Sequence, residues 1–478
     1  MASGEPVPAP IPPPARGQSH VWLRGLAMAA ITLVIAAGVV LVGADFVRRQ
    51  GLPTPTGTAG PSPTTAGSPS GSPGASPVET PAPSPTAAPT SVPVAQRWNV
   101  ERIDVQALPF GISAAAVSGA RLVAIGRSNC EPESAPTECW VNVFTSDDNA
   151  RSWVAAPRSD ALAIGILVPP SGPEPGMLDI AGGPEGFLAI GYDRAFRPAF
   201  WTSTDGRQWS VATGGGSFDR SRVRTVAATG TGWVVGGEVF GDDEPRAAIW
   251  TSPDGAAWTR VPDGPAFDIG GYLDTGEEPG TGGIFDILGQ GSTTIAVGRS
   301  CNATGQGCEP AVWRSTGGPW SRVPIDGPPF VGVLRSVAPF GAAIIATGMQ
   351  ECAPAPCSDE DLVGVVLRSG DGATWTQREI AVTAGTFGIG ALAATSGYLV
   401  GVVEGPQGPP GELVLAGSVD GDTWEVLPNV PPLGLSGIRA VGFTATPDGS
   451  ILVVGWGDVP GDQLSFTSFM LLVTRVPA

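Results

Sequence analysis

The sequence predicts an all-β fold built from repeated small sheets, and three observations support this. First, the motif S-x-D-G-x-x-W occurs four times, each time between two short apolar runs. Second, the tryptophans of these motifs and of two variants follow one another at spacings of 49 to 62 residues. Third, Gly contributes 69 and Pro 50 of the 478 residues, which suits a chain with many turns.

Each motif is expected to form the turn of a β-hairpin, and we call these six stretches the box turns. Gly supplies a position with positive φ, and the Asp carboxylate accepts N–H groups within the turn. The Trp opens the next strand and buries its ring. The regular box turns contain Ser203, Asp205 and Trp209; Ser252, Asp254 and Trp258; Ser369, Asp371 and Trp375; and Ser418, Asp420 and Trp424. A longer form with Ala in place of Gly contains Ser146, Asp148 and Trp153, and a form without the Asp runs from Ser315 to Trp320.

Short strands that recur with a period of about 50 residues predict a β-propeller. In one repeat, an inner strand at 223–228 is followed by a second strand at 232–239, a third at 247–251, the box turn, and a fourth at 258–261. The residue two positions before each box Ser is apolar, which indicates one common register: Phe144, Trp201, Trp250, Trp313, Leu367 and Ala416.

The two ends of the repeat region are expected to complete one blade together. After the last box turn, three strands follow at 438–442, 451–456 and 469–475, without a fourth. Residues 98–103 begin with Trp and resemble the fourth strands, and Trp98 lies 55 residues before Trp153. We therefore predict seven blades, with the N-terminal strand as the outer strand of the last one, which hides the sheet edges. Six or eight blades are the alternatives.

The box turns resemble the Asp-box, or bacterial neuraminidase (BNR), repeat S/T-x-D-x-G-x-x-W. That repeat is found in sialidases, sortilin-type receptors, photosystem assembly factors and many bacterial surface propellers. Four of the six copies in this chain are one residue shorter between Ser and Trp. The resemblance covers most of residues 97–478 and implies a propeller in which the boxes are structural turns, away from the catalytic face. It implies no particular activity.

The cysteines indicate an oxidising compartment. They form three close pairs, each in an equivalent loop of a different repeat, and we expect three local disulfides. A metal site is the alternative, but residues 97–478 contain no His and the pairs belong to separate repeats. The pairs are Cys130 with Cys139, Cys301 with Cys308, and Cys352 with Cys357.

The segment before the repeats predicts a membrane anchor and a stalk. Residues 1–20 are expected to be a disordered cytoplasmic tail, and 21–47 a transmembrane helix, because 26–44 carry no charge over a length that fits the bilayer core. Residues 48–96 are rich in Pro, Thr, Ser and Gly and are expected to form a disordered linker. The propeller at 97–478 would then be extracytoplasmic. A cleaved signal peptide is the alternative.

The composition excludes several kinds of chemistry. The net charge of −18 argues against nucleic acid as a partner. The only His is His20 and the chain has no Lys, so the repeats cannot form a Ser-His-Asp triad, a His-ligated metal site or a Schiff base. The acidic stretches 147–149, 242–244 and 359–361 lack the spacing of a calcium loop. We therefore expect no metal and no cofactor.

Five charged residues of the inner strands are candidates for ligand binding. We expect Arg224, Arg335 and Arg439 to share one register in the third, fifth and seventh blades. Asp179 and Asp286 fall one position later in the second and fourth. Guanidinium groups near one channel mouth could hold a carboxylate or phosphate, and the sialidases that the repeat resembles use an Arg triad. The alternative is Arg–Asp pairing between blades.

The most consistent functional hypothesis is a membrane-anchored binding or scaffold module whose loops hold a protein, peptide or glycan ligand. A sialidase-type glycoside hydrolase is the first alternative. That chemistry needs a Tyr activated by a carboxylate, and none of Tyr192, Tyr272 and Tyr398 is clearly paired with a Glu, so we assign no catalytic residue. A periplasmic assembly factor is the second alternative.

Overall fold

The computed structural model describes residues 97–104, 111–130, 139–163, 176–193, 195–240, 245–264, 266–267, 283–301, 308–351, 363–382, 388–404, 412–460 and 466–476. All of them belong to one compact unit, residues 88–478. The predicted tail, transmembrane helix and linker lie outside the described residues. Within the described part, no helix is long and apolar enough to span a membrane.

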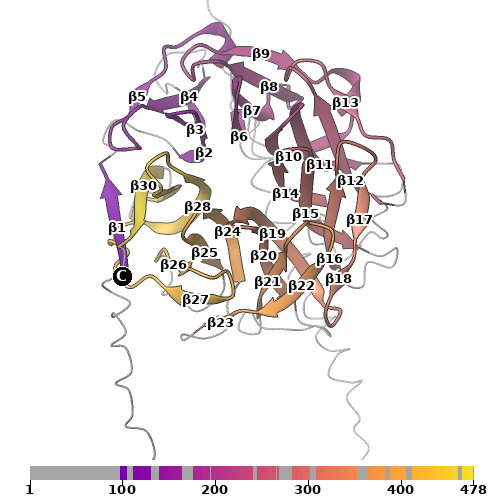
Figure 1. Cartoon of the computed structure of the whole chain (residues 1–478). Coiled ribbons are helices and arrows are strands. Elements are labelled where there is room, and N and C mark those ends of the chain that lie inside the picture. The colour runs from indigo at the N-terminus through magenta and orange to yellow at the C-terminus, as the bar shows by residue number, and fades with distance from the viewer. Residues whose placement is uncertain are drawn as a thin grey trace, which may run out of the picture. The chain divides into compact units, whose positions relative to one another are not determined.

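The described strands form a β-propeller of seven blades arranged in a ring (Figure 1). Blade 1 comprises β2 (Ile112–Ser118), β3 (Arg121–Cys130), β4 (Cys139–Ser146) and β5 (Val154–Ala155). Blade 2 comprises β6 (Gly176–Gly183), β7 (Gly186–Tyr192), β8 (Pro198–Ser203) and β9 (Ser210–Thr213). Blade 3 comprises β10 (Ser221–Thr229), β11 (Gly232–Phe240), β12 (Pro245–Ser252) and β13 (Thr259–Arg260).

The other four blades have the same order of strands from the inside to the outside. Blade 4 comprises β14 (Gly283–Gln290), β15 (Thr293–Cys301), β16 (Cys308–Ser315) and β17 (Ser321–Val323). Blade 5 comprises β19 (Val331–Phe340), β20 (Ala343–Glu351), β21 (Val363–Ser369) and β22 (Trp375–Glu379). Blade 6 comprises β24 (Gly388–Ala394), β25 (Leu399–Glu404), β26 (Leu415–Ser418) and β27 (Thr423–Val426). Blade 7 comprises β28 (Ser436–Ala445), β29 (Ile451–Asp458), β30 (Phe466–Arg475) and β1 (Trp98–Ile103).

The predicted ring closure is confirmed. Strand β1 pairs antiparallel with β30 from Trp98 opposite Arg475 to Ile103 opposite Met470, and the Val476 N–H donates to the Arg97 carbonyl at 2.9 Å. Trp98 is 3% exposed and meets Tyr398 of blade 6 edge-on, with ring centroids 5.4 Å apart. The first and last described strands therefore share one sheet, and the outer edge of blade 7 is supplied by the N-terminal side of the chain.

The strand order divides the propeller into two faces. Each inner strand leads through a tight turn to the second strand, and this turn lies at the same end of the blade as the turn between the third and fourth strands. We call this end the box face, because the box turns lie there, and the opposite end the loop face. Since β1 takes the place of a fourth strand, Arg97 and Val476 both lie at the box face.

The box turns have the internal geometry that the motif predicts. Gly206, Gly255, Gly372 and Gly421 have φ between 70° and 80°, and their N–H groups donate to the box Ser hydroxyl at 2.7 to 2.9 Å. In the longer turn, Ala150 takes the same position with φ of 69°. The Asp carboxylate accepts two further N–H groups, as Asp254 does from Ala256 and Ala257 at 2.9 Å each. These bonds lower the pKa of Asp254, with Ala257 as the largest cause.

The glycines of the four regular box turns also pack on the preceding blade. A Cβ atom added to Gly372 of blade 5 would lie 2.5 Å from Ile295 Cδ1 of blade 4, and one on Gly206 of blade 2 would lie 2.5 Å from Val123 Cγ2 of blade 1. The turn Gly is thus required both for the backbone conformation and for the close approach of neighbouring blades.

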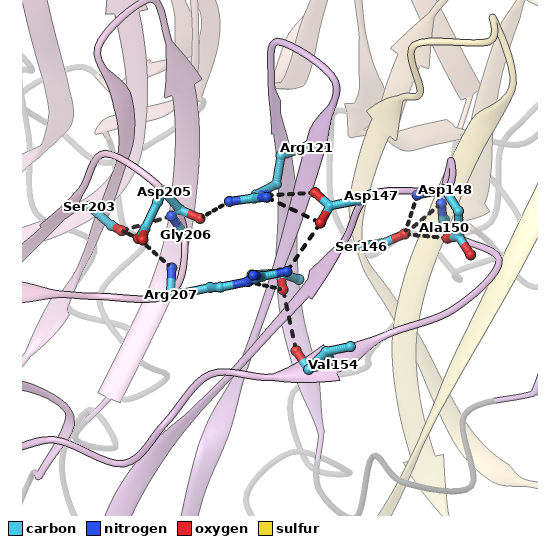
Figure 2. Close-up of polar contacts among 11 residues, drawn as sticks. Arg121, Ser146, Asp147, Asp148, Ala150, Val154, Ser203, Asp205, Gly206 and Arg207 are labelled. Carbon is cyan, nitrogen blue, oxygen red and sulfur yellow. Dashed lines mark hydrogen bonds and ion pairs between the residues drawn. The ribbon is translucent and has the colours of Figure 1, made fainter.

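Charged side chains connect box turns of adjacent blades (Figure 2). Arg121 from β3 binds the Asp147 carboxylate at 2.6 and 3.1 Å and donates to the Asp205 carbonyl of blade 2 at 2.7 Å. Arg207 of blade 2 reaches the same carboxylate at 3.1 Å. The hydrogen bond from Arg121 is the largest cause that lowers the pKa of Asp147. This network is exposed and lies on the box face.

The apolar register predicted two residues before each box Ser is confirmed, because all six side chains are buried: Phe144, Trp201, Trp250, Trp313, Leu367 and Ala416. The three tryptophans among them also fix the linkers between blades. Their indole N–H groups donate to the carbonyls of Ala161, Ser217 and Ala266 respectively.

Two features of the outer edge were not predicted. Strand β18 (Ile325–Asp326) pairs parallel with β22, and β23 (Ala381–Val382) pairs parallel with β27. In blades 5 and 6, the linker from the preceding blade therefore adds a short fifth strand outside the fourth. Two short 3₁₀ helices, η1 (Asp160–Leu162) and η2 (Gly215–Phe218), occur in linkers of blades 1 and 2.

Candidate functional site

The inner strands carry a bulge at equivalent positions in all seven blades. Their pairing with the second strand shifts between Ile112 and Ala114, Met177 and Asp179, Val223 and Thr225, Ile284 and Asp286, Leu334 and Ser336, Ile389 and Leu392, and Ala440 and Gly442. A bulge leaves a residue outside the ladder and redirects side chains. In blades 3, 4 and 5 the residue left out is Arg224, Phe285 and Arg335.

The bulges surround a cavity of ≈ 340 Å³ in the centre of the ring. Every blade contributes to its lining, from Ala114 of blade 1 to Gly442 of blade 7. Four of the five charged candidates line this one cavity: Asp179, Arg224, Asp286 and Arg335. The inner strands run from the loop face to the box face, so the Arg positions lie one residue closer to the loop face than the Asp positions.

An aromatic ring lies between the two arginines in chain order and contacts both. The guanidinium carbon of Arg224 is 4.9 Å from the centroid of the Phe285 ring, and that of Arg335 is 5.1 Å from it. Both distances are within the range of a cation–π interaction. Phe285 therefore connects the cations of blades 3 and 5 across blade 4.

The two arginines differ in what neutralises them. Arg224 donates to Glu238 Oε1 at 2.9 Å, and Arg222 lies 3.3 Å from the same oxygen. Glu238 is 0% exposed, whereas the side chains of Arg222 and Arg224 are 37% and 22% exposed, so the carboxylate is the buried partner. Arg335 is exposed toward the cavity and pairs with no carboxylate among the described residues; its contact is the Phe285 ring. Arg335 is thus the more available cation.

The two aspartates join neighbouring blades. Asp179 of blade 2 accepts the Val226 N–H of blade 3 at 2.9 Å. Asp286 of blade 4 accepts the Ser336 hydroxyl and the Val337 N–H of blade 5, each at 2.8 Å. The predicted alternative of Arg–Asp pairing between blades is wrong for these two residues, because their partners in the next blade are backbone and hydroxyl groups.

Both carboxyl groups have raised pKa values. Desolvation is the largest cause for each, because their oxygens face strand backbone rather than bulk water. Desolvation raises the pKa of Asp179 to about 7, although the hydrogen bond from Val226 lowers this pKa. The negative charge of Asp286 also raises the pKa of Asp179. Desolvation raises the pKa of Asp286 to about 6, against the bonds from Val337 and Ser336.

Arg439 does not share the register of the other two arginines. In the strand ladder, Arg439 lies opposite Trp456 of β29. It is two residues before Val441, the residue that the bulge of blade 7 leaves out of the ladder. Arg439 is thus equivalent to Arg222, not to Arg224. The predicted common register is wrong at this strand because β28 contains two register shifts, after Ser436 and after Ala440.

The described tyrosines have structural contacts. Tyr192 is buried, and its hydroxyl accepts the Val223 N–H at 3.1 Å; burial raises the pKa of Tyr192. The Tyr398 hydroxyl donates to the carbonyls of Gly449 and Val473, each at 2.9 Å. Tyr192 lies near Glu238, but its hydroxyl is engaged by backbone. Tyr272 lies outside the described residues.

The four described cysteines lie at the loop face, where the register supports two of the three expected pairs. Cys301 is directly opposite Cys308 at the end of β15 and β16, and Cys130 is opposite Cys139 at the end of β3 and β4. Cys308 is buried and is part of a disulfide. Cys352 and Cys357 lie outside the described residues. Within the described part, no group of His, Cys, Asp or Glu could hold a metal ion.

Two residues of the site were not identified from the sequence. Phe285 is one position before Asp286, so it has the same register as Arg224 and Arg335 and could have been found by the same alignment. Glu238 has no such signal, because it lies on a second strand and its burial depends on the packing of blade 3 against blade 4.

No family model and no curated protein matches this chain. Solved structures that are similar to it include YCF48 bound to D1 peptide, at 13% identity and a TM-score of 0.45, covering 81% of this chain and 100% of that one. A protein of unknown function from Dyadobacter fermentans has 12% identity and a TM-score of 0.42, covering 80% and 100%. A sialidase from Trypanosoma rangeli has 10% identity and a TM-score of 0.39, covering 77% of this chain and 55% of its own.

Proposed function

We propose that this chain is a membrane-anchored, extracytoplasmic propeller that acts as a binding or scaffold module. Its ligand is a protein, peptide or glycan held on the loop face, with one group of the ligand inserted into the central cavity. The proposal includes no catalytic step, and it keeps the predicted orientation with the N-terminus in the cytoplasm.

The observation that carries the proposal is the lining of the cavity. A cavity of ≈ 340 Å³ is comparable to a small ligand pocket. Its wall presents the exposed cation of Arg335 beside the Phe285 ring, together with Leu178, which is 38% exposed. A cation, an aromatic face and an apolar side chain on a rigid ring of strands are the elements of a recognition site.

The path of the chain is consistent with this orientation. Because Arg97 lies at the box face, the chain reaches the propeller at the face opposite the loops. The expected disulfides at the loop face would stiffen the loops that surround the ligand.

The test is a screen of the full-length chain on peptide and glycan arrays, repeated with two variants. We expect binding to at least one class of ligand, and R335A should weaken that binding at least about tenfold, since it removes a charge-assisted contact. The matched control is R151A, because Arg151 is a 56% exposed cation on the box face. Absence of binding on both arrays, equal binding by R335A, or hydrolysis of a fluorogenic sialoside would contradict the proposal.

A further inference from the structure

The charges around the central cavity depend on protonation. Asp179 and Asp286 line the same cavity as Arg224 and Arg335, so their ionisation changes the potential at the exposed guanidinium of Arg335. Among the residues whose side chains the structure describes, the other charged or titratable groups on strands near the bulges come from five elements: Tyr192 on β7, Arg222 and Arg224 on β10, Glu238 on β11, Arg299 on β15, and Arg335 on β19.

Two of these groups form an ion-pair cluster with Glu238, because Arg222 and Arg224 lie 3.3 and 2.9 Å from its Oε1 atom. Desolvation moves the pKa of Asp179 to about 7 and that of Asp286 to about 6. The cavity therefore becomes more positive by up to two charges as the pH falls from 8 to 5.

The same two carboxyls are fixed in place by their hydrogen bonds to the next blade. Val226 holds Asp179, and Ser336 with Val337 holds Asp286, so neither side chain can turn away from the cavity when an anion enters. Ser336 directly follows Arg335 in β19, which places the Asp286 carboxyl against the strand segment that carries the cation. An anion beside Arg335 would thus be repelled by ionised aspartates and tolerated by protonated ones.

We propose that the central cavity binds an anionic group at Arg335, beside the Phe285 ring, and that this binding is coupled to proton uptake by Asp179 and Asp286. The inference deepens the proposed function, because it assigns the chemical class of the inserted ligand group and the condition under which it binds. Arg224 acts as a positioning residue that holds Phe285 from the other neighbouring blade. Ligand binding is then favoured in an acidified compartment and weakened at pH 8.

The probe is benzenesulfonate, whose charge is constant between pH 5 and 8, so that any pH dependence belongs to the protein. Its dissociation constant for the full-length chain is measured by calorimetry at pH 5, 6.5 and 8 and at constant ionic strength. We expect binding to be about tenfold tighter at pH 5 than at pH 8, as expected for the loss of nearby negative charge. At pH 6.5, titrations in buffers of different ionisation enthalpy should show net proton uptake.

Three variants separate the parts of the proposal. R335Q should lose the binding at every pH, and R151Q on the box face should leave it unchanged. The double variant D179N/D286N should bind at pH 8 as tightly as the wild-type chain binds at pH 5. If the double variant does not fold, the proton uptake of the wild-type chain remains decisive.

Several results would overturn the proposal: no binding at pH 5, equal affinity at pH 5 and pH 8, zero proton uptake, or undiminished binding by R335Q. Failure of the proposed function is distinguishable from these. A chain that takes up protons with benzenesulfonate but binds nothing on the arrays retains the proton-linked site and loses the role in macromolecular binding. A chain that binds a ligand on the arrays but takes up no protons with benzenesulfonate retains the role in macromolecular binding and loses the proton-linked site.

Discussion

The box glycines are the residues on which neighbouring blades depend most directly. Gly372 combines a φ of 72° with a position where a Cβ atom would meet Ile295 at 2.5 Å. Gly317, in the box turn without an Asp, has a φ of 83° but no atom within 4 Å of such a Cβ. The two glycines separate backbone strain from crowding between blades.

We therefore expect G372A to cost more than G317A. G317A adds only the left-handed conformation of a non-Gly residue, about 1 kcal/mol of unfolding free energy. G372A adds overpacking against blade 4, for a total of about 3 kcal/mol. Urea unfolding of both variants measures the difference. Equal losses of unfolding free energy in the two variants would show that the interface with blade 4 accommodates the added methyl group without destabilisation.

The aspartates of the cavity and those of the box turns are expected to change the unfolding free energy in opposite directions as the pH rises. Asp179 and Asp286 have raised pKa values, so their contribution is complete below the unfolded pKa near 4 and is lost as the pH rises through about 6 to 7. Asp205 and Asp254 have lowered pKa values because of backbone hydrogen bonds, so their contribution is lost as the pH falls below about 4.

The unfolding free energy should accordingly decrease from pH 5 to pH 8, by on the order of 1–3 kcal/mol. The variant D179N/D286N should show a flat profile over this interval, even if its absolute stability is lower. Urea unfolding at pH 5, 6, 7 and 8 measures both profiles. A wild-type chain that is equally stable at pH 5 and pH 8 would refute the assignment of raised pKa values.

At the residue scale, the sequence predicts the roles of residues that depend on local turn chemistry. It does not predict roles that depend on packing between blades. The Gly and Asp of the box turns follow from turn chemistry, and the motif alone is sufficient. The burial of Glu238 follows from the packing of blade 3 on Gly283 of blade 4, which no local pattern shows.

At the scale of elements, β1 is the strand whose packing decides whether the ring is closed. Trp98 packs edge-on against Tyr398, and its ring occupies the space where a Cβ on Gly417 would lie, at 2.5 Å. We expect W98A to lower the unfolding free energy by about 3–5 kcal/mol, as for other buried aromatic truncations. The control is N99A on the same strand, because Asn99 is exposed. If urea unfolding shows equal losses for W98A and N99A, β1 contributes no specific packing.

The paired ends of β15 and β16 predict the partner of the Cys308 disulfide. Cys301 is its cross-strand neighbour, so digestion without reductant should release a Cys301–Cys308 linked peptide, detected by mass spectrometry. C308S should cost about 2 kcal/mol, the value for a short loop in the chain-entropy model. Detection of Cys308 linked to any other cysteine would refute the pairing.

The register of a strand is predictable from the sequence in some blades and not in others. The strand β1 was predicted at 98–103 as the structure has it, because Trp and alternation mark both its start and its faces. Arg439 was placed two residues out of register, because β28 has a second shift after Ser436 that changes spacing without changing composition. The added strands β18 and β23 have two residues each, too short to leave a periodic signal.

At the scale of the molecule, blade 7 differs from the other six in that its third and fourth strands are not joined by a box turn. The Val476 N–H donates to the Arg97 carbonyl at 2.9 Å where such a turn would lie. A circular permutant that joins these ends with a short Gly-Ser linker and opens the chain between Gly341 and Ala342 should fold. Gly341 is in a tight turn with no atom within 4 Å of an added Cβ.

We expect the permutant to melt cooperatively within about 5 °C of the wild-type chain, since exposed turns tolerate new termini. Differential scanning calorimetry measures the transition, and a second permutant opened inside β29, between Val453 and Val454, is the control that should fail to fold. Loss of cooperative melting in the first permutant would show that free ends are needed to close the ring.

The pairing of the first described strand with the last has a consequence for synthesis. Residues 98–103 are synthesised before the other described strands, and their partner β30 after them. A product terminated before β30 lacks that partner, and we expect its Trp98 and two unpaired sheet margins to be accessible to proteases and chaperones. The ring thereby acts as a check on synthesis through β30, since only a chain that includes this strand can hide both margins.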